Sequence, residues 1–202
     1  MTPSKYRKVT ERESKYARGA FAMLVNHLPG MYWHPNTNWG NGFYTSGLPD
    51  GEIRLCGGHI ICAEFKAAKA DNLAALYLGN PCDPVDSAGW TVKQRTYWRK
   101  YLEPYRIPLF LVAWVYAESH IPERTNILVE KSNLFVVPPE AWLALEEKAA
   151  GQTMTVGLTP ATARFKEFGL LDEWAAFRLD VVDSCYIVPA SHILMQTIQQ
   201  FN

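Results

Sequence analysis

The sequence predicts a mixed fold of helices and strands, of the α/β (α+β) class, and three observations support this prediction. Apolar side chains recur at helical spacing through residues 10–28, and Pro29 with Gly30 ends the pattern. Residues 59–66 carry the clearest strand pattern, since alternate side chains form one wholly apolar face. Residues 107–116 are almost wholly apolar, which is typical of a buried strand.

The first helix is expected over residues 10–28. Thr10 and Glu13 have the spacing of a capping box, in which the threonine hydroxyl accepts from a backbone N–H and the glutamate reaches back. The helical repeat places Glu13 in line with Leu24, on the side expected to be buried, and Arg18 on the side expected to face solvent. Glu13 is therefore open to two interpretations, a helix cap or a carboxylate that takes part in a site.

Two strands are expected next, over residues 50–55 and 59–66, with Gly57 and Gly58 as the turn between them. Residues 31–49, which precede them, are rich in Asn, Gly and aromatic side chains and predict a loop. This loop could bind DNA by stacking aromatic side chains on splayed bases, or it could pack against a partner subunit.

The middle of the chain continues with both kinds of element. A short helix is expected over residues 71–78 and a loop over residues 80–89. The helix expected over residues 91–105 carries aromatic side chains near one side and basic side chains on the rest. The apolar strand over residues 107–116 follows it.

The last third of the chain is expected to add more strands and helices. Strands are predicted over residues 126–129 and 133–137. Pro139 then opens a helix over residues 139–150, because a proline in the first turn costs no hydrogen bond. Beyond this helix the patterns are weaker, and they predict two helices and one strand, over 161–177, 191–201 and 181–188.

The composition is that of an ordinary globular domain. The chain has 202 residues, 48% of them apolar, and 20 Lys+Arg residues balance 20 Asp+Glu residues. We predict a single domain over residues 1–202, with its core over about 10–150 and a C-terminal extension of unknown role over 151–202. At zero net charge, binding to DNA would need a local basic patch.

The sequence also bears on cellular location. No apolar run approaches the roughly 20 residues of a membrane-spanning helix, and the N-terminal residues lack the apolar core of a signal peptide. The four cysteines form no CxxC pair, which favours reduced thiols over a zinc ribbon. Cys62 is not expected to be a nucleophile, because an apolar strand raises the pKa of a thiol. A cytoplasmic protein without membrane contact is therefore expected.

Charged side chains interrupt the strand over residues 59–66. Glu64 and Lys66 project from the same face, about 6–7 Å apart along the backbone. Burial of this pair is costly unless something compensates it. A divalent cation held by Glu64 and by Asp50, with thirteen residues between them, would do so, and Mg²⁺ prefers one or two carboxylates with water and phosphate. Lys66 would then orient or deprotonate the attacking water.

Each of these residues also has a purely structural interpretation. Asp50 stands in the segment Leu-Pro-Asp-Gly, which is an ordinary turn sequence. Glu64 and Lys66 could pair with each other on a sheet face that is open to water. Ile60 and Cys62 share that face, however, and indicate that it is covered.

Pro49-Asp50, followed by a spacer and by Glu64-Phe65-Lys66 on a strand, resembles the PD-(D/E)xK nuclease superfamily, whose members include restriction enzymes, Holliday-junction resolvases and RecB-type exonucleases. The resemblance implies a central mixed β-sheet flanked by helices, the restriction-endonuclease-like core. It also implies Mg²⁺-dependent hydrolysis of DNA phosphodiesters that leaves 5′-phosphate ends, with Mn²⁺ able to substitute. Carried over to this chain, it makes Asp50 and Glu64 the metal ligands and Lys66 the base that activates water.

Two further residues fit the wider pattern of that superfamily. Several members supply an acidic residue from the first helix, which here would be Glu13. Many place a glutamine on the helix after the Glu-x-Lys strand, which here is Gln94. Gln94 with Tyr97 or Trp98 is similar to the RecB-type QxxxY element, although the tyrosine follows at i+3 rather than i+4. Gln94 could equally be a buried amide without a catalytic role.

DNA is the predicted partner. Basic side chains on the helix after the proposed site are expected to contact phosphates, although such side chains often serve solubility alone. They are Lys93, Arg95, Arg99 and Lys100. The sequence thus predicts a Mg²⁺-dependent DNA endonuclease, and a homodimer would allow both strands to be cut. The alternative is a non-catalytic nucleic-acid-binding or inhibitory protein, for instance of a phage or mobile element, that retains the nuclease fold.

Overall fold

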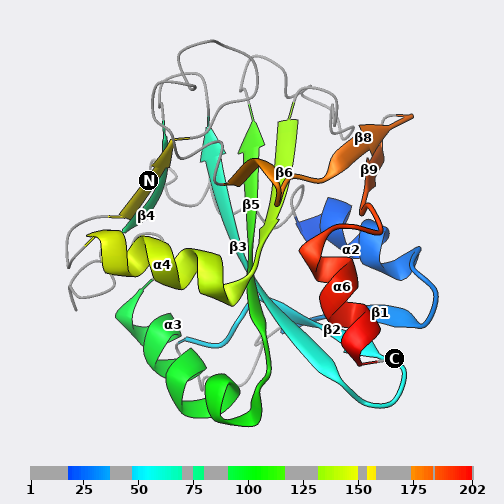
Figure 1. The fold of residues 1–202 in the computed structure, drawn as a ribbon, viewed down its shortest axis with the longest axis horizontal. Helices are drawn as coiled ribbons and strands as arrows, with labels where there is room; N and C mark the ends of the chain where they lie inside the picture. The colour runs from blue at the N-terminus through cyan, green and yellow to red at the C-terminus, as the bar shows by residue number, and fades with distance from the viewer. Residues whose placement is uncertain are drawn as a thin grey trace, which may run out of the picture.

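The computed structural model describes residues 18–36, 47–69, 75–79, 91–116, 132–149, 154–157, 174–183 and 185–201 (Figure 1). At its centre lies a five-stranded sheet of order β1-β2-β3-β5-β6, made of Met31–Pro35, Gly51–Leu55, Ile60–Lys69, Leu109–Tyr116 and Ser132–Val137. β3 and β5 run parallel, and the other neighbouring pairs are antiparallel. The predicted α/β (α+β) class, with a mixed sheet flanked by helices, is therefore confirmed.

Helices cover both faces of this sheet (Figure 1). One face carries α2 (Arg18–Asn26), α6 (Ile193–Gln200) and the hairpin of β8 (Asp180–Val182) and β9 (Cys185–Ile187). The other carries α4 (Pro139–Ala149) and α3 (Val92–Tyr97), which continues through a π-helical turn, η2 (Trp98–Leu102), and a 3-10 turn, η3 (Glu103–Tyr105). β4 (Ala75–Gly79) and β7 (Met154–Gly157) form a separate antiparallel pair. Among the helices of the described residues, none has the length and apolar character to cross a membrane.

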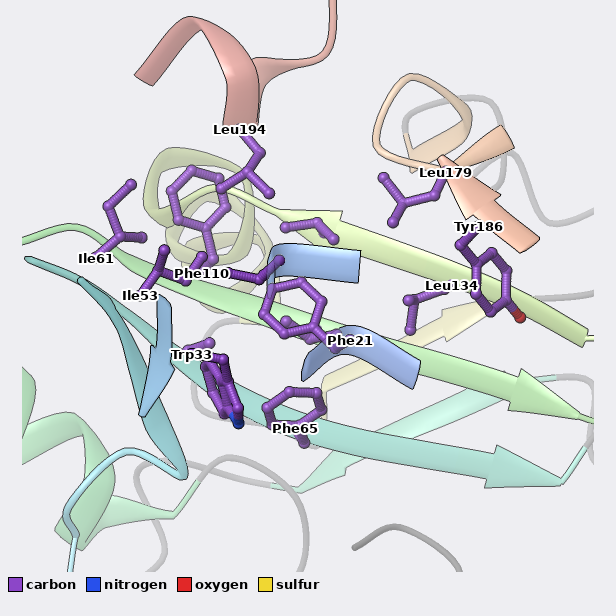
Figure 2. Packing of buried hydrophobic residues seen from close by; sticks show 14 of the residues in the cluster. Phe21, Trp33, Ile53, Ile61, Phe65, Phe110, Leu134, Leu179, Tyr186 and Leu194 are labelled. Carbon is purple, nitrogen blue, oxygen red and sulfur yellow. The ribbon is translucent and has the colours of Figure 1, made fainter. Parts of the chain in front are cut away.

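The α2 face of the sheet holds an aromatic cluster (Figure 2). Alternation along β3 turns Phe65 toward this face, as the strand pattern predicts. Phe21 of α2, Trp33 of β1 and Phe65 contact one another edge to face, with ring centroids 5.4 to 5.6 Å apart. This trio fixes α2 over the strands that carry the candidate site.

The C-terminal part of the chain completes the same core. Figure 2 shows Leu179 and Tyr186 beside Leu134 of β6 and Leu194 beside Phe110 of β5, and all five are buried. Ile198 of α6 belongs to the same cluster. Part of the segment 151–202, to which the sequence assigns no role, thus forms one wall of the core.

Most of the predicted elements are confirmed, namely those over 50–55, 59–66, 91–105, 107–116, 133–137, 139–150 and 191–201. Two predictions are wrong, since residues 31–35 form strand β1 instead of a loop and residues 75–78 belong to strand β4 instead of a helix. The strand predicted over 181–188 is a hairpin of two short strands. Residues 10–17 and 126–129, and most of the helix predicted over 161–177, lie outside the described residues.

α6 begins at a buried histidine. The Nδ1 atom of His192 accepts a hydrogen bond from the N–H of Leu194 at 3.1 Å, and its Nε2 atom lies 3.1 Å from the carbonyl oxygen of Phe177. Because an accepting Nδ1 carries no proton, Nε2 is the donor and the cap requires a neutral ring. Burial accordingly lowers the pKa of His192 from its ordinary value of 6.5.

We expect this cap to make the fold less stable in acid. Below pH 6.5 the unfolded chain takes up a proton at His192 that the folded chain still excludes, so the free energy of unfolding decreases as the pH falls. His192→Asn keeps a capping side chain and removes the titrating group. Melting curves between about pH 7.5 and pH 5 should therefore show a smaller loss of Tm for His192→Asn than for the wild type. His27→Asn, at an exposed position, is the control, and equal slopes for both variants would contradict the assigned role.

Candidate functional site

Asp50 directly precedes β2. Gly51 is paired with Ala63 in the antiparallel ladder of β2 and β3. Asp50, which precedes Gly51, therefore lies beside Glu64, which follows Ala63. The N–H of Phe65 donates a hydrogen bond to Asp50 Oδ2 at 2.8 Å. This bond ties the carboxylate to β3 at the residue between Glu64 and Lys66. The backbone positions of the three predicted site residues therefore adjoin one another.

Two glycines allow the segment around Asp50 to approach its neighbours. Gly47 has a φ of 107°, and a Cβ atom there would overlap the backbone carbonyl of Lys93 on α3. Gly51 packs on Trp33 so closely that a Cβ atom would overlap the indole ring. Asp50 is thus held between the first turn of α3 on one side and the aromatic cluster of the α2 face on the other.

Glu64 is buried on the α3 face of the sheet, with 3% of the residue exposed. Lys66 donates from Nζ to Glu64 Oε1 at 2.7 Å, and Gln94 of α3 donates from Nε2 to the same oxygen. The structure therefore brings together three of the predicted site residues. Glu64 and Lys66 therefore pair with each other, as the structural alternative expects, but the face is covered, since the Lys66 side chain is only 13% exposed.

Gln94 reaches Glu64 because the start of α3 orients its amide. Gln94 is the third residue of the helix, and its Oε1 atom accepts from the N–H of Thr91 at 2.9 Å. The N–H of Gln94 donates to the Thr91 hydroxyl at 3.3 Å, which completes a capping box. Because Oε1 faces the cap, the amide nitrogen faces Glu64. The Gln94 amide thus contacts both the cap of α3 and Glu64.

Arg18, predicted to lie on the solvent side of the first helix, is turned toward Asp50 instead. Its Nη2 atom donates to Asp50 Oδ1 in an ion pair, and the side chains of Arg18 and Asp50 are 32% and 18% exposed. The guanidinium also lies over the ring of Phe65, 5.9 Å from its centroid. The prediction for Arg18 is therefore wrong, because the helical repeat alone cannot show what the helix faces.

Two acidic and two basic side chains thus form two ion pairs, which share one cluster because Asp50 and Glu64 occupy adjoining backbone positions. Lys66 neutralises Glu64 from the α3 face of the sheet. Arg18, on α2, neutralises Asp50. The formal charges of these four side chains sum to zero without a metal ion.

The donor set of the cluster suits a hard divalent cation. Asp50 and Glu64 offer carboxylate oxygens, the ligands that Mg²⁺ prefers, and Mg²⁺ needs only one or two of them because it keeps several waters. Among the described residues, His, Cys, Asp and Glu side chains form no group of three or more that could hold a metal. Glu13, the predicted third acidic residue, lies outside the described residues.

Two groups near the site, the Cys62 thiol and the Tyr97 hydroxyl, have raised pKa values and are therefore harder to ionise. Burial and the carboxylate of Glu52 raise the pKa of the Cys62 thiol to about 12, in agreement with the prediction that it is no nucleophile. Burial also raises the pKa of Tyr97. Trp98 is buried against Trp142 in the core between α3 and the sheet, so Tyr97 is the more accessible of the two aromatic residues considered with Gln94.

Three of the four residues predicted to contact phosphate are exposed along α3 and η2, namely Lys93, Arg99 and Lys100. Arg95 is turned toward α4 instead, where its Nε atom lies 2.8 Å from Glu146 Oε1. Its side chain is 24% exposed. Arg95 therefore links two helices, a role that the run of basic residues did not indicate.

No protein-family model matches this chain, and the searches of curated proteins and of solved structures likewise find no match.

Proposed function

We propose that this chain is a Mg²⁺-dependent DNA endonuclease of the PD-(D/E)xK type, which hydrolyses phosphodiester bonds with a water nucleophile. One observation supports the proposal: Asp50, Glu64, Lys66 and Gln94 lie together where the start of β2, β3 and α3 meet. Burial of the Glu64 carboxylate carries an unfavourable desolvation free energy, even though a lysine and a glutamine both donate to one of its oxygens. A catalytic role would account for the presence of a charged residue there.

Each side chain has a role in this proposal. Asp50 and Glu64 would hold the Mg²⁺ ion, which when bound supplies positive charge to the phosphate and acidifies its water. Lys66 lies beside Glu64 and would orient the attacking water or accept its proton. Gln94 holds the Glu64 carboxylate in place through the capping box of α3.

DNA would lie across α3 and η2. Lys93, Arg99 and Lys100 are exposed there, and the Nζ atom of Lys100 lies 5.0 Å from the ring centroid of Tyr101, which is itself exposed. Lysine and arginine contacts to phosphate fix the register of a protein on a duplex. We further propose a cytoplasmic homodimer, in which two symmetric sites would cut the two strands.

A plasmid-nicking assay tests this function. The wild type should convert supercoiled plasmid to the nicked form in Mg²⁺ or Mn²⁺ and should lose this activity in EDTA. Asp50→Asn should lower the rate by about 10²-fold or more, because a group that stabilises developing charge is lost. Glu52→Gln is the matched control, since Glu52 lies two residues further along, on β2, and pairs with Arg54 at 2.6 Å. Nicking that survives Asp50→Asn, or that is absent from the wild type in both metals, would refute the proposal.

One observation favours the non-catalytic alternative, a nucleic-acid-binding or inhibitory protein that retains the nuclease fold. Arg18 and Lys66 already neutralise Asp50 and Glu64, so this cluster is charge-balanced without any metal. A protein of this kind would bind DNA in a gel-shift assay and lose affinity on Lys93→Ala or Lys100→Ala. It would nick no plasmid in either metal, which distinguishes it from the enzyme.

A further inference from the structure

Arg18 occupies one of the two oxygens of the Asp50 carboxylate. Oδ2 accepts from the backbone N–H of Phe65 at 2.8 Å, and Oδ1 accepts from Nη2 of Arg18. Both oxygens are therefore engaged by the chain itself. The Nε atom of Arg18 is buried and has no acceptor within the part of the chain that the structure describes. Within that part, the Asp50 carboxylate is the acceptor that holds the guanidinium.

The two partners of Asp50 differ in how easily they can leave. The N–H of Phe65 belongs to the backbone of β3, in the middle of the sheet, and stays where the sheet holds it. The Arg18 guanidinium belongs instead to a flexible side chain that is 32% exposed. A cation that approaches Asp50 meets a guanidinium of the same sign at Oδ1, and Coulomb repulsion at that range is strong in a partly buried site.

We propose that Arg18 gates the metal site, as a positioning residue that holds Asp50 in the metal-free protein and leaves Oδ1 when Mg²⁺ binds. The inference rests on the proposed function, since it concerns the ion that Asp50 and Glu64 would share. Arg18 and the cation compete for one carboxylate oxygen. The affinity of the protein for Mg²⁺ is thereby set below what the two carboxylates alone would provide.

Calorimetric titration of metal-free, DNA-free protein with Mg²⁺ tests the gate without any measurement of nicking. Arg18→Gln should bind Mg²⁺ about tenfold more tightly than the wild type, the order expected when one competing charged hydrogen bond is removed. Arg18→Lys keeps the charge and should stay within a few-fold of the wild type. Circular dichroism spectra confirm that each variant is folded.

Arg54→Gln provides the matched control for the loss of one positive charge. Arg54 pairs with Glu52 at 2.6 Å on the same strand, and its side chain is 52% exposed. Its substitution should leave the affinity for Mg²⁺ unchanged. An equal gain in Arg18→Gln and Arg54→Gln would mean that only the net charge matters, and an equal or weaker affinity in Arg18→Gln would refute the gate.

A measurement on the wild type covers the case in which Arg18→Gln does not fold. The arginine Nε–H resonances are followed by NMR during a Mg²⁺ titration, after assignment with the Arg18→Lys variant. The signal of Arg18 should shift with metal while that of Arg54 stays, and an unmoved Arg18 signal on saturation would refute the gate.

If neither the wild type nor any variant binds Mg²⁺ at millimolar concentration, the metal site and the gate are both refuted. If the wild type nicks plasmid but Arg18→Gln binds Mg²⁺ no more tightly, the gate alone falls.

Discussion

Lys66→Ala is expected to lower the free energy of unfolding by about 3 kcal/mol, because the buried Glu64 carboxylate loses its cation. In the wild type the Lys66 ammonium lies 2.7 Å from Glu64 Oε1. In the variant, Gln94 still donates to that oxygen, but from a neutral amide. Desolvation of the carboxylate is paid in the folded state whether or not the cation is present. Urea unfolding of the metal-free protein measures the difference.

A double substitution distinguishes a lost ion pair from lost packing. Glu64→Gln combined with Lys66→Met removes both charges and keeps the approximate shape, so its stability should return to within about 1 kcal/mol of the wild type. Lys100→Ala, at an exposed position, is the control and should cost less than about 0.5 kcal/mol. If Lys66→Ala were as mild as Lys100→Ala, the pair would contribute nothing and Glu64 would be neutral in the fold.

The same Lys66→Ala protein should nick plasmid at least about 10²-fold more slowly than the wild type, the loss typical of a missing acid–base group. Lys66→Arg should recover the stability but little of the rate, since an arginine does not give up its proton near neutral pH. A rate that follows stability across the three proteins would point to a structural lysine.

β3 and its charged residues were predictable because their pattern is local. A period of two residues assigns Phe65 to one face and Glu64 with Lys66 to the other, whatever covers each face. The apolar neighbours Ile60 and Cys62 indicated that the charged face is covered, and α3 covers it. Gln94 was selected only through the resemblance to the nuclease superfamily, and its capping contact with Thr91 shows why its amide points as it does.

β1 and β4 were not predictable from local patterns, because each is a strand through its partner. Residues 31–35 carry two aromatic side chains and a histidine, and the residues after them are rich in Asn and Gly, as in a loop. Residues 31–35 nevertheless pair with β2 along their whole length. Residues 75–79 suit a helix by spacing, yet they pair with β7, which lies far along the chain at 154–157. In both cases pairing between distant segments decides the structure, and propensity does not.

Arg18 and Arg95 were misjudged for a related reason. A helical repeat and a run of basic residues describe one helix at a time, and both residues find carboxylates on other elements. Arg18 reaches Asp50, 32 residues away, and Arg95 reaches Glu146 on α4. Neither acidic partner carries a signal in the sequence that assigns it to an arginine.

Gln94→Glu is expected to destabilise the protein at neutral pH by about 2 kcal/mol, while it leaves the cap of α3 intact. A glutamate suits the third position of a capping box, because its carboxylate accepts from the N–H of Thr91 as the amide does. The same change removes the N–H that Glu64 Oε1 receives and brings a second carboxylate against it. Two carboxylates at hydrogen-bond distance repel each other unless they share a proton.

The pH dependence of this variant distinguishes the cap from the site. A shared proton raises the pKa of the new pair above that of an unfolded glutamate, so the folded state binds more protons and the loss of stability should shrink as the pH falls from about 7 to 5. Thr91→Ala is the matched control, since it removes the hydroxyl that accepts from the N–H of Gln94 and leaves Glu64 untouched. It should cost about 1 kcal/mol at every pH in this range. Urea unfolding at both pH values measures both variants. A cost for Gln94→Glu that stays constant or grows as the pH falls would mean that the amide serves the helix alone, because a glutamate in the first turn of a helix is by itself favoured in its charged form.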